Sequence, residues 1–205
     1  MAMSADRTYR ALVGTQSVTL PLVPVSDDCT IALLICVDLG VAFARTAGGE
    51  LAELLAPLEP EVVVSVATMG IPLAIEVSRA LGLDDYVILH KTPKIHLGDS
   101  FAEPVRSITT ESRQTLRLDP ARVDAVRGRR VVVVDDVIST GASTWAALAL
   151  VRRAGGDPVA VGVLMTEGKA WKDALGIDAA KVVALGSMPV FRPDPGGGEP
   201  RPDWG

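Results

Sequence analysis

Short runs of continuous apolar residues, rich in valine, recur from residue 61 onward and constrain the fold more than any other feature. They occupy residues 61–67, 85–90, 129–136, 158–165 and 181–186. Strands that are apolar on both faces are typical of a parallel sheet covered by helices. Stretches with helical spacing of apolar residues lie between the runs, at 71–83, 143–156 and 169–175. This alternation predicts an α/β fold with right-handed crossovers and a ligand site at the carboxyl ends of the strands.

The remaining segments depart from this alternation. Residues 17–25 and 29–37 flank a polar turn and predict a hairpin, and residues 40–58 predict a helix in which Gly48 and Gly49 are potential interruptions. Residues 91–118 lack a sustained apolar period, and a loop of that length is usually functional or mobile. Residues 193–205, rich in proline and glycine, predict a disordered tail.

Composition limits the size and class of the protein. The 205 residues suffice for one buried core, so we expect a single domain over 1–205. A hydrophobic fraction of 48% with only 4% aromatic residues predicts an aliphatic core. A formal net charge of -5 argues against nucleic acid and against a membrane surface as partners. No apolar stretch is long enough to span a membrane, so we expect a cytoplasmic protein.

Cysteine and histidine give little sign of metal or redox chemistry. Cys29 and Cys36 match no metal or redox spacing and suggest core thiols in a reducing compartment. The two histidines, His90 and His96, have no ligand-like companions. We therefore expect no metal site built from protein side chains.

Residues 131–144 carry the most specific chemical pattern. Four valines lead to Asp135 and Asp136, and a loop of small and hydroxyl residues follows ahead of the expected helix. A helix N-terminus with free backbone N–H groups binds phosphate, and glycine permits close approach. The expected phosphate-binding residues are Ser139, Thr140, Gly141, Ala142 and Ser143, with Thr144 as a further hydroxyl.

Two common phosphate motifs do not fit this loop. A nucleoside-triphosphate P-loop requires a lysine before its Ser/Thr, and a dinucleotide fingerprint requires three spaced glycines with an acid about 20 residues later. Here the acids directly precede the loop. Carboxylates can accept hydrogen bonds from sugar hydroxyls or face a magnesium ion and its waters, so a phosphorylated ribose fits both halves of the pattern.

The stretch 131–144 resembles the signature of the type I phosphoribosyltransferases, which bind phosphoribosyl diphosphate. The resemblance covers about residues 60–185, the expected core. It implies a single α/β domain with a mostly parallel twisted sheet flanked by helices, a small hood and a long flexible loop. The N-terminal residues from about 8 to 38 and the end of the chain would form the hood, which binds the base.

The resemblance also implies roles for individual residues. Asp135 and Asp136 would act as catalytic residues that hold the ribose 2- and 3-hydroxyls. The turn at 65–70, where the family often has a non-proline cis peptide, would bind diphosphate through Ala67, Thr68, Met69 and Gly70.

Residues outside these two segments complete the implied site. Lys91 and Lys94 would contact the diphosphate. Glu111 and Arg113 would lie in the catalytic loop, although the Glu-Tyr-Gly pattern of adenine enzymes is missing there. Glu167, Lys169, Trp171 and Phe191 are candidates for contact with the base.

The implied activity is transfer of a 5-phosphoribosyl group from phosphoribosyl diphosphate to a purine, with adenine favoured, in purine salvage. Mg²⁺ would be bound mainly through the sugar diphosphate, and family members are commonly homodimers. Alternatives are a hypoxanthine/xanthine-type or pyrimidine enzyme, a degenerate member that binds nucleotide without transfer, and a regulator that only senses the sugar diphosphate.

Overall fold

A computed structural model describes residues 7–92, 101–105, 115–194, 196 and 198–205. Its centre is a parallel sheet in the order β10-β9-β8-β4-β5. These strands are β4 Val62–Val66, β5 Tyr86–Leu89, β8 Arg130–Ile138, β9 Asp157–Glu167 and β10 Val182–Met188. Each of the valine-rich runs forms one of these strands, which confirms the α/β prediction.

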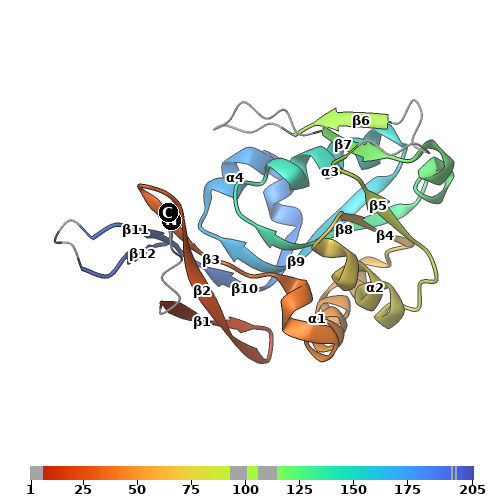
Figure 1. The fold of residues 1–205 in the computed structure, drawn as a ribbon. Helices are drawn as coiled ribbons and strands as arrows, with labels where there is room; N and C mark the ends of the chain where they lie inside the picture. The colour runs from red at the N-terminus through yellow and green to blue at the C-terminus, as the bar shows by residue number, and fades with distance from the viewer. Residues whose placement is uncertain (1–6, 93–100, 106–114, 195, 197) are drawn as a thin grey trace.

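Helices cover both faces of this sheet (Figure 1). On one side lie α1 Gly40–Leu55 and α2 Gly70–Ala80, and on the other lie α3 Ala142–Arg153 and α4 Ala170–Leu175. The helix α1 runs unbroken through Gly48 and Gly49. A Cβ atom at Gly48 would lie 2.5 Å from Glu76 Cβ of α2, so the glycine allows the two helices to pack closely. Short 3₁₀ turns connect the layers at Cys36–Leu39, Ala56–Leu58, Pro120–Ala125 and Gly176–Lys181.

A second sheet is built from both ends of the chain and is referred to below as the hood. Its order is β1-β2-β3-β11-β12, and it lies beside the central sheet in Figure 1. Its strands are β1 Thr8–Val13, β2 Gln16–Ser26, β3 Cys29–Ala32, β11 Val190–Arg192 and β12 Arg201–Asp203. The expected hairpin is β2 and β3, while β1 is an additional strand.

The prediction of a disordered tail over 193–205 is wrong for the part that the structure describes. The strand β12 pairs antiparallel with β11, and Arg192 forms an ion pair with Asp203 at 3.2 Å. Arg201 pairs with Asp194 at 2.5 Å. An edge strand tolerates proline, because the missing N–H group can lie on the side that has no neighbouring strand. The composition of this segment therefore did not exclude a strand.

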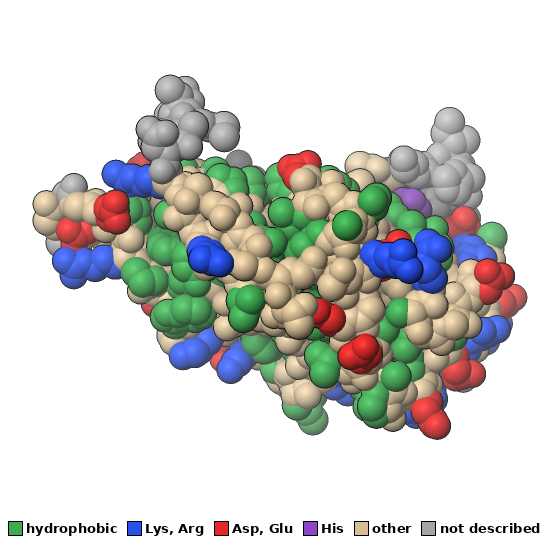
Figure 2. Space-filling view, turned by 90° about the horizontal axis from the view of Figure 1, so that it is seen from below, with side chains coloured by type: hydrophobic (Ala, Val, Ile, Leu, Met, Phe, Trp, Pro, Cys, Tyr) green, Lys and Arg blue, Asp and Glu red, His purple; other side chains and the backbone are tan. Residues whose placement is uncertain are grey.

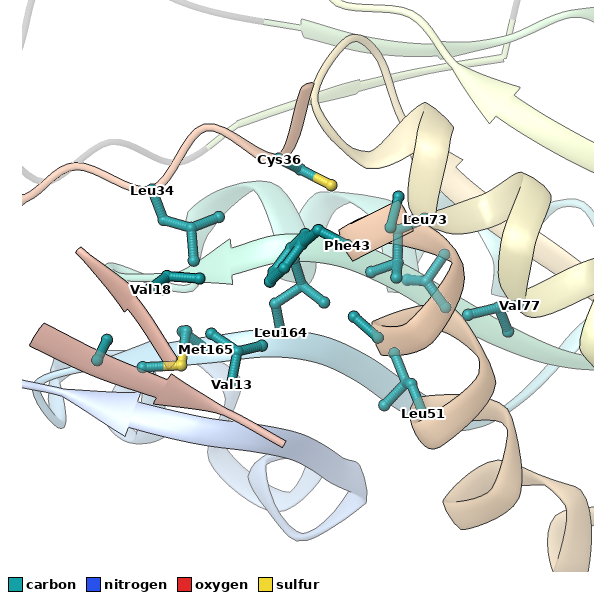
Figure 3. Packing of buried hydrophobic residues seen from close by; sticks show 14 of the residues in the cluster. Val13, Val18, Leu34, Cys36, Phe43, Leu51, Leu73, Val77, Leu164 and Met165 are labelled. Carbon is teal, nitrogen blue, oxygen red and sulfur yellow. The ribbon is translucent and has the colours of Figure 1, made fainter. Parts of the chain in front are cut away.

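The hood and the helical layer share one apolar core. Figure 3 shows Val13 and Val18 of the hood facing Phe43 of α1 and Leu164 and Met165 of β9. The turn between β1 and β2 donates a hydrogen bond from Gly14 N to Leu185 O of β10 at 3.1 Å. The hood is therefore fixed to the edge of the central sheet.

Two described parts of the 91–118 segment form a two-stranded ribbon, β6 Phe101–Pro104 and β7 Thr115–Leu118. Leu116 and Leu118 are buried against the α3 layer. Arg153 of α3 donates to Ala102 O at 2.7 Å and to Glu103 Oε2 at 2.8 Å. These two parts of the segment thus have regular structure, and residues 93–100 and 106–114 lie outside the described residues.

The face that carries α1 and α2 shows basic side chains interspersed with acidic and apolar ones (Figure 2). None of the helices in the described parts of the chain combines the length and the hydropathy required to cross a membrane.

Candidate functional site

The candidate site lies where β4 and β8 are neighbours in the central sheet. From β4 the chain leaves through α2 toward β5, whereas from β8 it leaves through α3 toward β9 on the opposite face. Such a switch point opens a crevice at the carboxyl ends of the strands, where ligands bind in open α/β sheets. The acidic pair, the turn after β4 and the loop after β8 all lie at this edge.

Asp135 and Asp136 belong to β8, which continues beyond them to Ile138. Both are half-buried. Asp135 Oδ1 accepts from the backbone N–H of Asp136 at 3.0 Å, and Asp136 Oδ1 accepts from the N–H of Val137 at 2.9 Å. The two carboxyl groups also interact with each other through a hydrogen bond that favours protonated Asp135 and ionised Asp136.

The acidic pair is held in an environment that disfavours two negative charges. Burial, together with the charge of Asp136, raises the pKa of Asp135 to about 8. Burial also raises the pKa of Asp136, against the effect of the Val137 N–H. The positive charge of Lys91 lowers the pKa of both carboxyls, so Lys91 acts electrostatically on the pair. A hydroxyl donor or a cation would relieve the repulsion between these carboxylates.

The turn after β4 approaches the pair from the other side of the crevice. The Ala67–Thr68 peptide bond is cis, as the family resemblance led us to expect. Thr68 and Met69 are exposed, and Ala67 N donates to Leu89 O at 2.8 Å. Beneath them, Ser65 Oγ donates to Val134 O at 2.7 Å and ties β4 to β8. The turn is thus exposed at Thr68 and Met69 and is held on a fixed base beside Asp135.

The loop after β8 leads into α3, which begins at Ala142. Gly141 has φ +79°, and a Cβ atom there would lie 3.1 Å from Ala174 Cβ and 3.2 Å from Trp171 Cα. The conformation and the lack of space both require glycine. Ala142 N donates to Thr140 Oγ1 at 3.4 Å. The loop therefore presents a helix N-terminus with hydroxyl residues on a base formed by α4.

Glu167 lies at the end of β9, beside this loop, and is only 4% exposed. Burial raises the pKa of its carboxyl, while a hydrogen bond from the Ser139 hydroxyl lowers it. Sequence reasoning considered Glu167 only for contact with the base. The pairing of Ile138 with Thr166, which brings the two strand ends together, was not visible in the sequence.

The other candidates on the base side have different surroundings from those expected. Lys169 Nζ donates to Gly205 O at 2.7 Å. Trp171 is 7% exposed, belongs to the core cluster of α3 and donates from Nε1 to Gly168 O at 3.1 Å. Phe191 packs edge-on against Tyr9 within the hood. Both aromatic rings pack against other parts of the protein, and their contact with the base stays a prediction.

Cys36, at the junction of hood and core, lies near enough to Asp136 for that charge to act on it. Burial raises the pKa of the Cys36 thiol to about 11, with a contribution from Asp136. Lys94, Glu111 and Arg113 lie outside the described residues. Within the described residues, no three side chains of the His, Cys, Asp and Glu types gather to hold a metal ion.

Comparison with known proteins gives this geometry a context. Residues 41–182 match the family model of the phosphoribosyl transferase domain. The chain is 29% identical over 133 residues to a xanthine phosphoribosyltransferase of Laribacter hongkongensis, covering 64% of each. It is 36% identical over 128 residues to an adenine phosphoribosyltransferase of Thermobifida fusca, covering 60% of this chain and 67% of the relative. The chain thus spans about two thirds or less of these relatives' lengths.

Among solved structures, adenine phosphoribosyltransferase from Rhodothermus marinus has the same fold. The TM-score is 0.66 at 21% identity, with 88% of this chain and 94% of that chain covered. This likeness covers a larger share of the chain than residues 41–182 do.

Proposed function

The chain belongs to the type I phosphoribosyltransferase family, and on that premise we propose that it transfers a 5-phosphoribosyl group from phosphoribosyl diphosphate to a purine base. The observation that carries the proposal is the position of Asp135 and Asp136. They lie on one strand between a phosphate-type loop at 139–143 and the turn at 67–70. Phosphoribosyl diphosphate has a 5-phosphate for the loop, ribose hydroxyls for the acidic pair and a diphosphate for the turn.

The acidic pair would accept hydrogen bonds from the ribose 2- and 3-hydroxyls. Two partly buried carboxylates with raised pKa values gain from such donors because the hydroxyls take the place of lost water. The transition state places positive charge on the ribose ring. Carboxylates fixed beside the ring stabilise that charge at little reorganisation cost.

The leaving diphosphate would lie along the turn at 67–70 with Lys91 nearby. The carboxyl end of β4 and that of β5 are adjacent, which places Lys91 next to the turn and to the acidic pair. By resemblance, Lys94 remains a candidate for the same end of the substrate, and Glu111 remains a candidate catalytic residue of the loop. Backbone N–H groups and an ammonium group both stabilise the negative charge that develops on the leaving group.

Magnesium fits the donors present only as a partner of the substrate. The carboxylate oxygens of Asp135 and Asp136 suit this hard cation, but the described side chains do not form a complete coordination shell. When bound with the diphosphate, Mg²⁺ would neutralise part of its charge. Asp135 and Asp136 would then accept hydrogen bonds from its waters.

We favour adenine as the base, and xanthine or hypoxanthine as the second candidate. Relatives of both the adenine and the xanthine type match at about 30% identity, which leaves the base open. The base would lie under the hood, where Cys36 borders Asp136. A homodimer is proposed on the family resemblance alone, and light scattering of the intact protein tests it.

Release of diphosphate from phosphoribosyl diphosphate and Mg²⁺ in the presence of adenine, hypoxanthine, guanine, xanthine, uracil or orotate tests the function. We expect release with one or more purines, and release with orotate or uracil alone would exclude a purine enzyme. Asp135→Asn and Asp136→Asn should each raise the KM for the sugar diphosphate and lower kcat. Asp124→Asn is the matched control, because Asp124 lies outside the site with its side chain 87% exposed. Tight binding of the sugar diphosphate without release would indicate a sensor.

A further inference from the structure

Glu167 is a buried acid beside the loop that we propose to bind phosphate. It ends β9, where Met188 of β10 is its partner, and it is 4% exposed. On its other side, Ile138 of β8 pairs with Thr166, so Glu167 stands beside Ser139. A carboxyl group is expensive to bury, and its presence here calls for a specific interaction.

The strand register sets Ser139, the first residue of the loop, beside Glu167, and its hydroxyl favours the ionised carboxylate and so lowers the pKa of Glu167. Ser139 has one proton to donate. Without ligand, that proton is held by the Glu167 carboxylate. A phosphate in the loop would need the same proton, and its negative charges would also repel a carboxylate one hydroxyl away.

The charged groups around Glu167 do not neutralise it. On β8 the ionisable groups nearest the loop are the acids Asp135 and Asp136, which supply no positive charge. In the turn after β9, Lys169 donates to Gly205 O, and in α4 Lys172 Nζ lies over the Trp171 ring at 5.5 Å from its centroid. Asp173 of α4 adds a further acid, and β10 carries no ionisable residue over 182–188. A bound phosphate would therefore disfavour the ionised form of Glu167.

We propose that Glu167 is a positioning residue that takes up one proton from solvent when a phosphate monoester enters the loop. The protonated carboxyl then donates to Ser139 Oγ, and the Ser139 hydroxyl turns its own proton toward a phosphate oxygen. One proton enters from water, and no covalent bond between heavy atoms forms or breaks. This inference rests on the proposed function, which assigns the 5-phosphate to this loop.

Proton uptake makes the affinity for phosphate depend on pH in a defined way. Above the pKa of free Glu167, the affinity should fall about tenfold for each unit of pH. Burial raises that pKa, which moves the onset of this fall above the range usual for glutamate. In Glu167→Gln the side-chain NH₂ group always donates to Ser139, so the fall should be lost while binding is retained.

Calorimetry of the full chain with ribose 5-phosphate, between about pH 6.5 and 9 in two buffers of different ionisation enthalpy, tests the proposal. On binding ribose 5-phosphate, the wild type should take up more protons than Glu167→Gln, by at most one proton per molecule. The difference isolates Glu167, because both proteins keep Asp135 and Asp136 and use the same ligand. Glu53→Gln, an exposed residue of α1, should behave as the wild type.

A second variant keeps the proposal testable if Glu167→Gln does not fold. Ser139→Ala removes the hydroxyl between Glu167 and the phosphate. This variant should bind ribose 5-phosphate more weakly and without the additional proton uptake. Equal proton uptake by the wild type and by both variants would overturn the role of Glu167 while leaving phosphate binding intact. If the wild type itself does not bind ribose 5-phosphate, the proposed function fails, and the inference falls with it.

Discussion

Gly70 lies so close to Asp135 that a Cβ atom at position 70 would stand 2.9 Å from Asp135 Oδ1. The same atom would stand 2.2 Å from Ser65 Oγ, which donates to Val134 O. The start of α2 and the acidic strand thus meet where only a hydrogen atom fits. The turn proposed for the diphosphate and the carboxylates proposed for the ribose are set relative to each other by this contact.

Gly70→Ala should therefore displace Asp135 or Ser65. We expect a loss of about 1–3 kcal/mol in the free energy of unfolding, as for overpacked cores, and a higher KM for the sugar diphosphate. Chemical denaturation and diphosphate-release kinetics measure the two effects. Gly49→Ala is the control, since a Cβ atom there meets nothing within 4 Å in the middle of α1. It should stabilise the protein by about 0.5–1 kcal/mol. Equal behaviour of the two variants would contradict the contact.

Asp135→Asn should stabilise the protein at high pH. Because the pKa of Asp135 is raised from 3.8 to about 8, the folded protein keeps a proton that the unfolded chain releases between these values. Wild-type stability therefore falls as pH rises through this window and levels off above it. Asparagine removes this dependence on pH. The free energy of unfolding of Asp135→Asn should exceed that of the wild type by about 1–3 kcal/mol near pH 9, which is less than the full pKa shift implies because solvent reaches the pair.

Thermal unfolding of wild type and Asp135→Asn from about pH 4 to 9 checks this dependence. The two melting curves should converge near pH 4 and separate progressively toward pH 9. Asp124→Asn should follow the wild type across the range, since its side chain is exposed. A constant difference between wild type and Asp135→Asn at every pH would mean that Asp135 is not held protonated.

Gly141→Ala should weaken phosphate binding. Its φ of +79° strains any other residue, and the new Cβ atom would press on Ala174 and Trp171 of α4. Gly128 has a similar φ of +73° but open space around it, so Gly128→Ala isolates the cost of the conformation. We expect both variants to lose about 1–2 kcal/mol in stability from strain. Only Gly141→Ala should lose affinity for ribose 5-phosphate in calorimetry, and similar affinities would argue that α4 does not support the loop.

The central sheet and the acidic pair were predictable because both depend on local sequence. Runs such as Val131–Val134 can be buried only between two helical layers, and Asp135 and Asp136 follow directly. The phosphate loop was recognisable for the same reason. The family and the type of fold followed from these few residues.

Contacts that depend on strand register could not be predicted from the sequence. Glu167 meets Ser139 only because Ile138 pairs with Thr166, and a slip by one residue would turn the carboxyl to the opposite face. Strand β12 was missed because the prolines and glycines of residues 193–205 predict disorder, whereas the strand forms ion pairs with Arg192 and Asp194. The burial of Trp171 under Gly141 could not be predicted either, because it depends on how α4 packs.

The hood should be loosened by Glu50→Ala. Glu50 of α1 accepts hydrogen bonds from the backbone N–H of Thr15 at 3.2 Å and from the Thr15 hydroxyl, and these hold the β1–β2 turn to the core. We expect a loss of about 1–3 kcal/mol in stability, because charged acceptors make the stronger hydrogen bonds. If the hood binds the base, the KM for the base should rise more than the KM for the sugar diphosphate.

Glu53→Ala, an exposed change on the same helix, is the matched control for that experiment and should be close to neutral. Steady-state kinetics with each substrate varied in turn separate the two KM values. Because the β1–β2 turn is held by Glu50 of α1 and Leu185 of β10, whereas the loop at 139–143 follows β8, calorimetry with ribose 5-phosphate should give the same affinity for Glu50→Ala and the wild type. An equal rise in both KM values would mean that the turn supports the whole fold and not the base side of the site in particular.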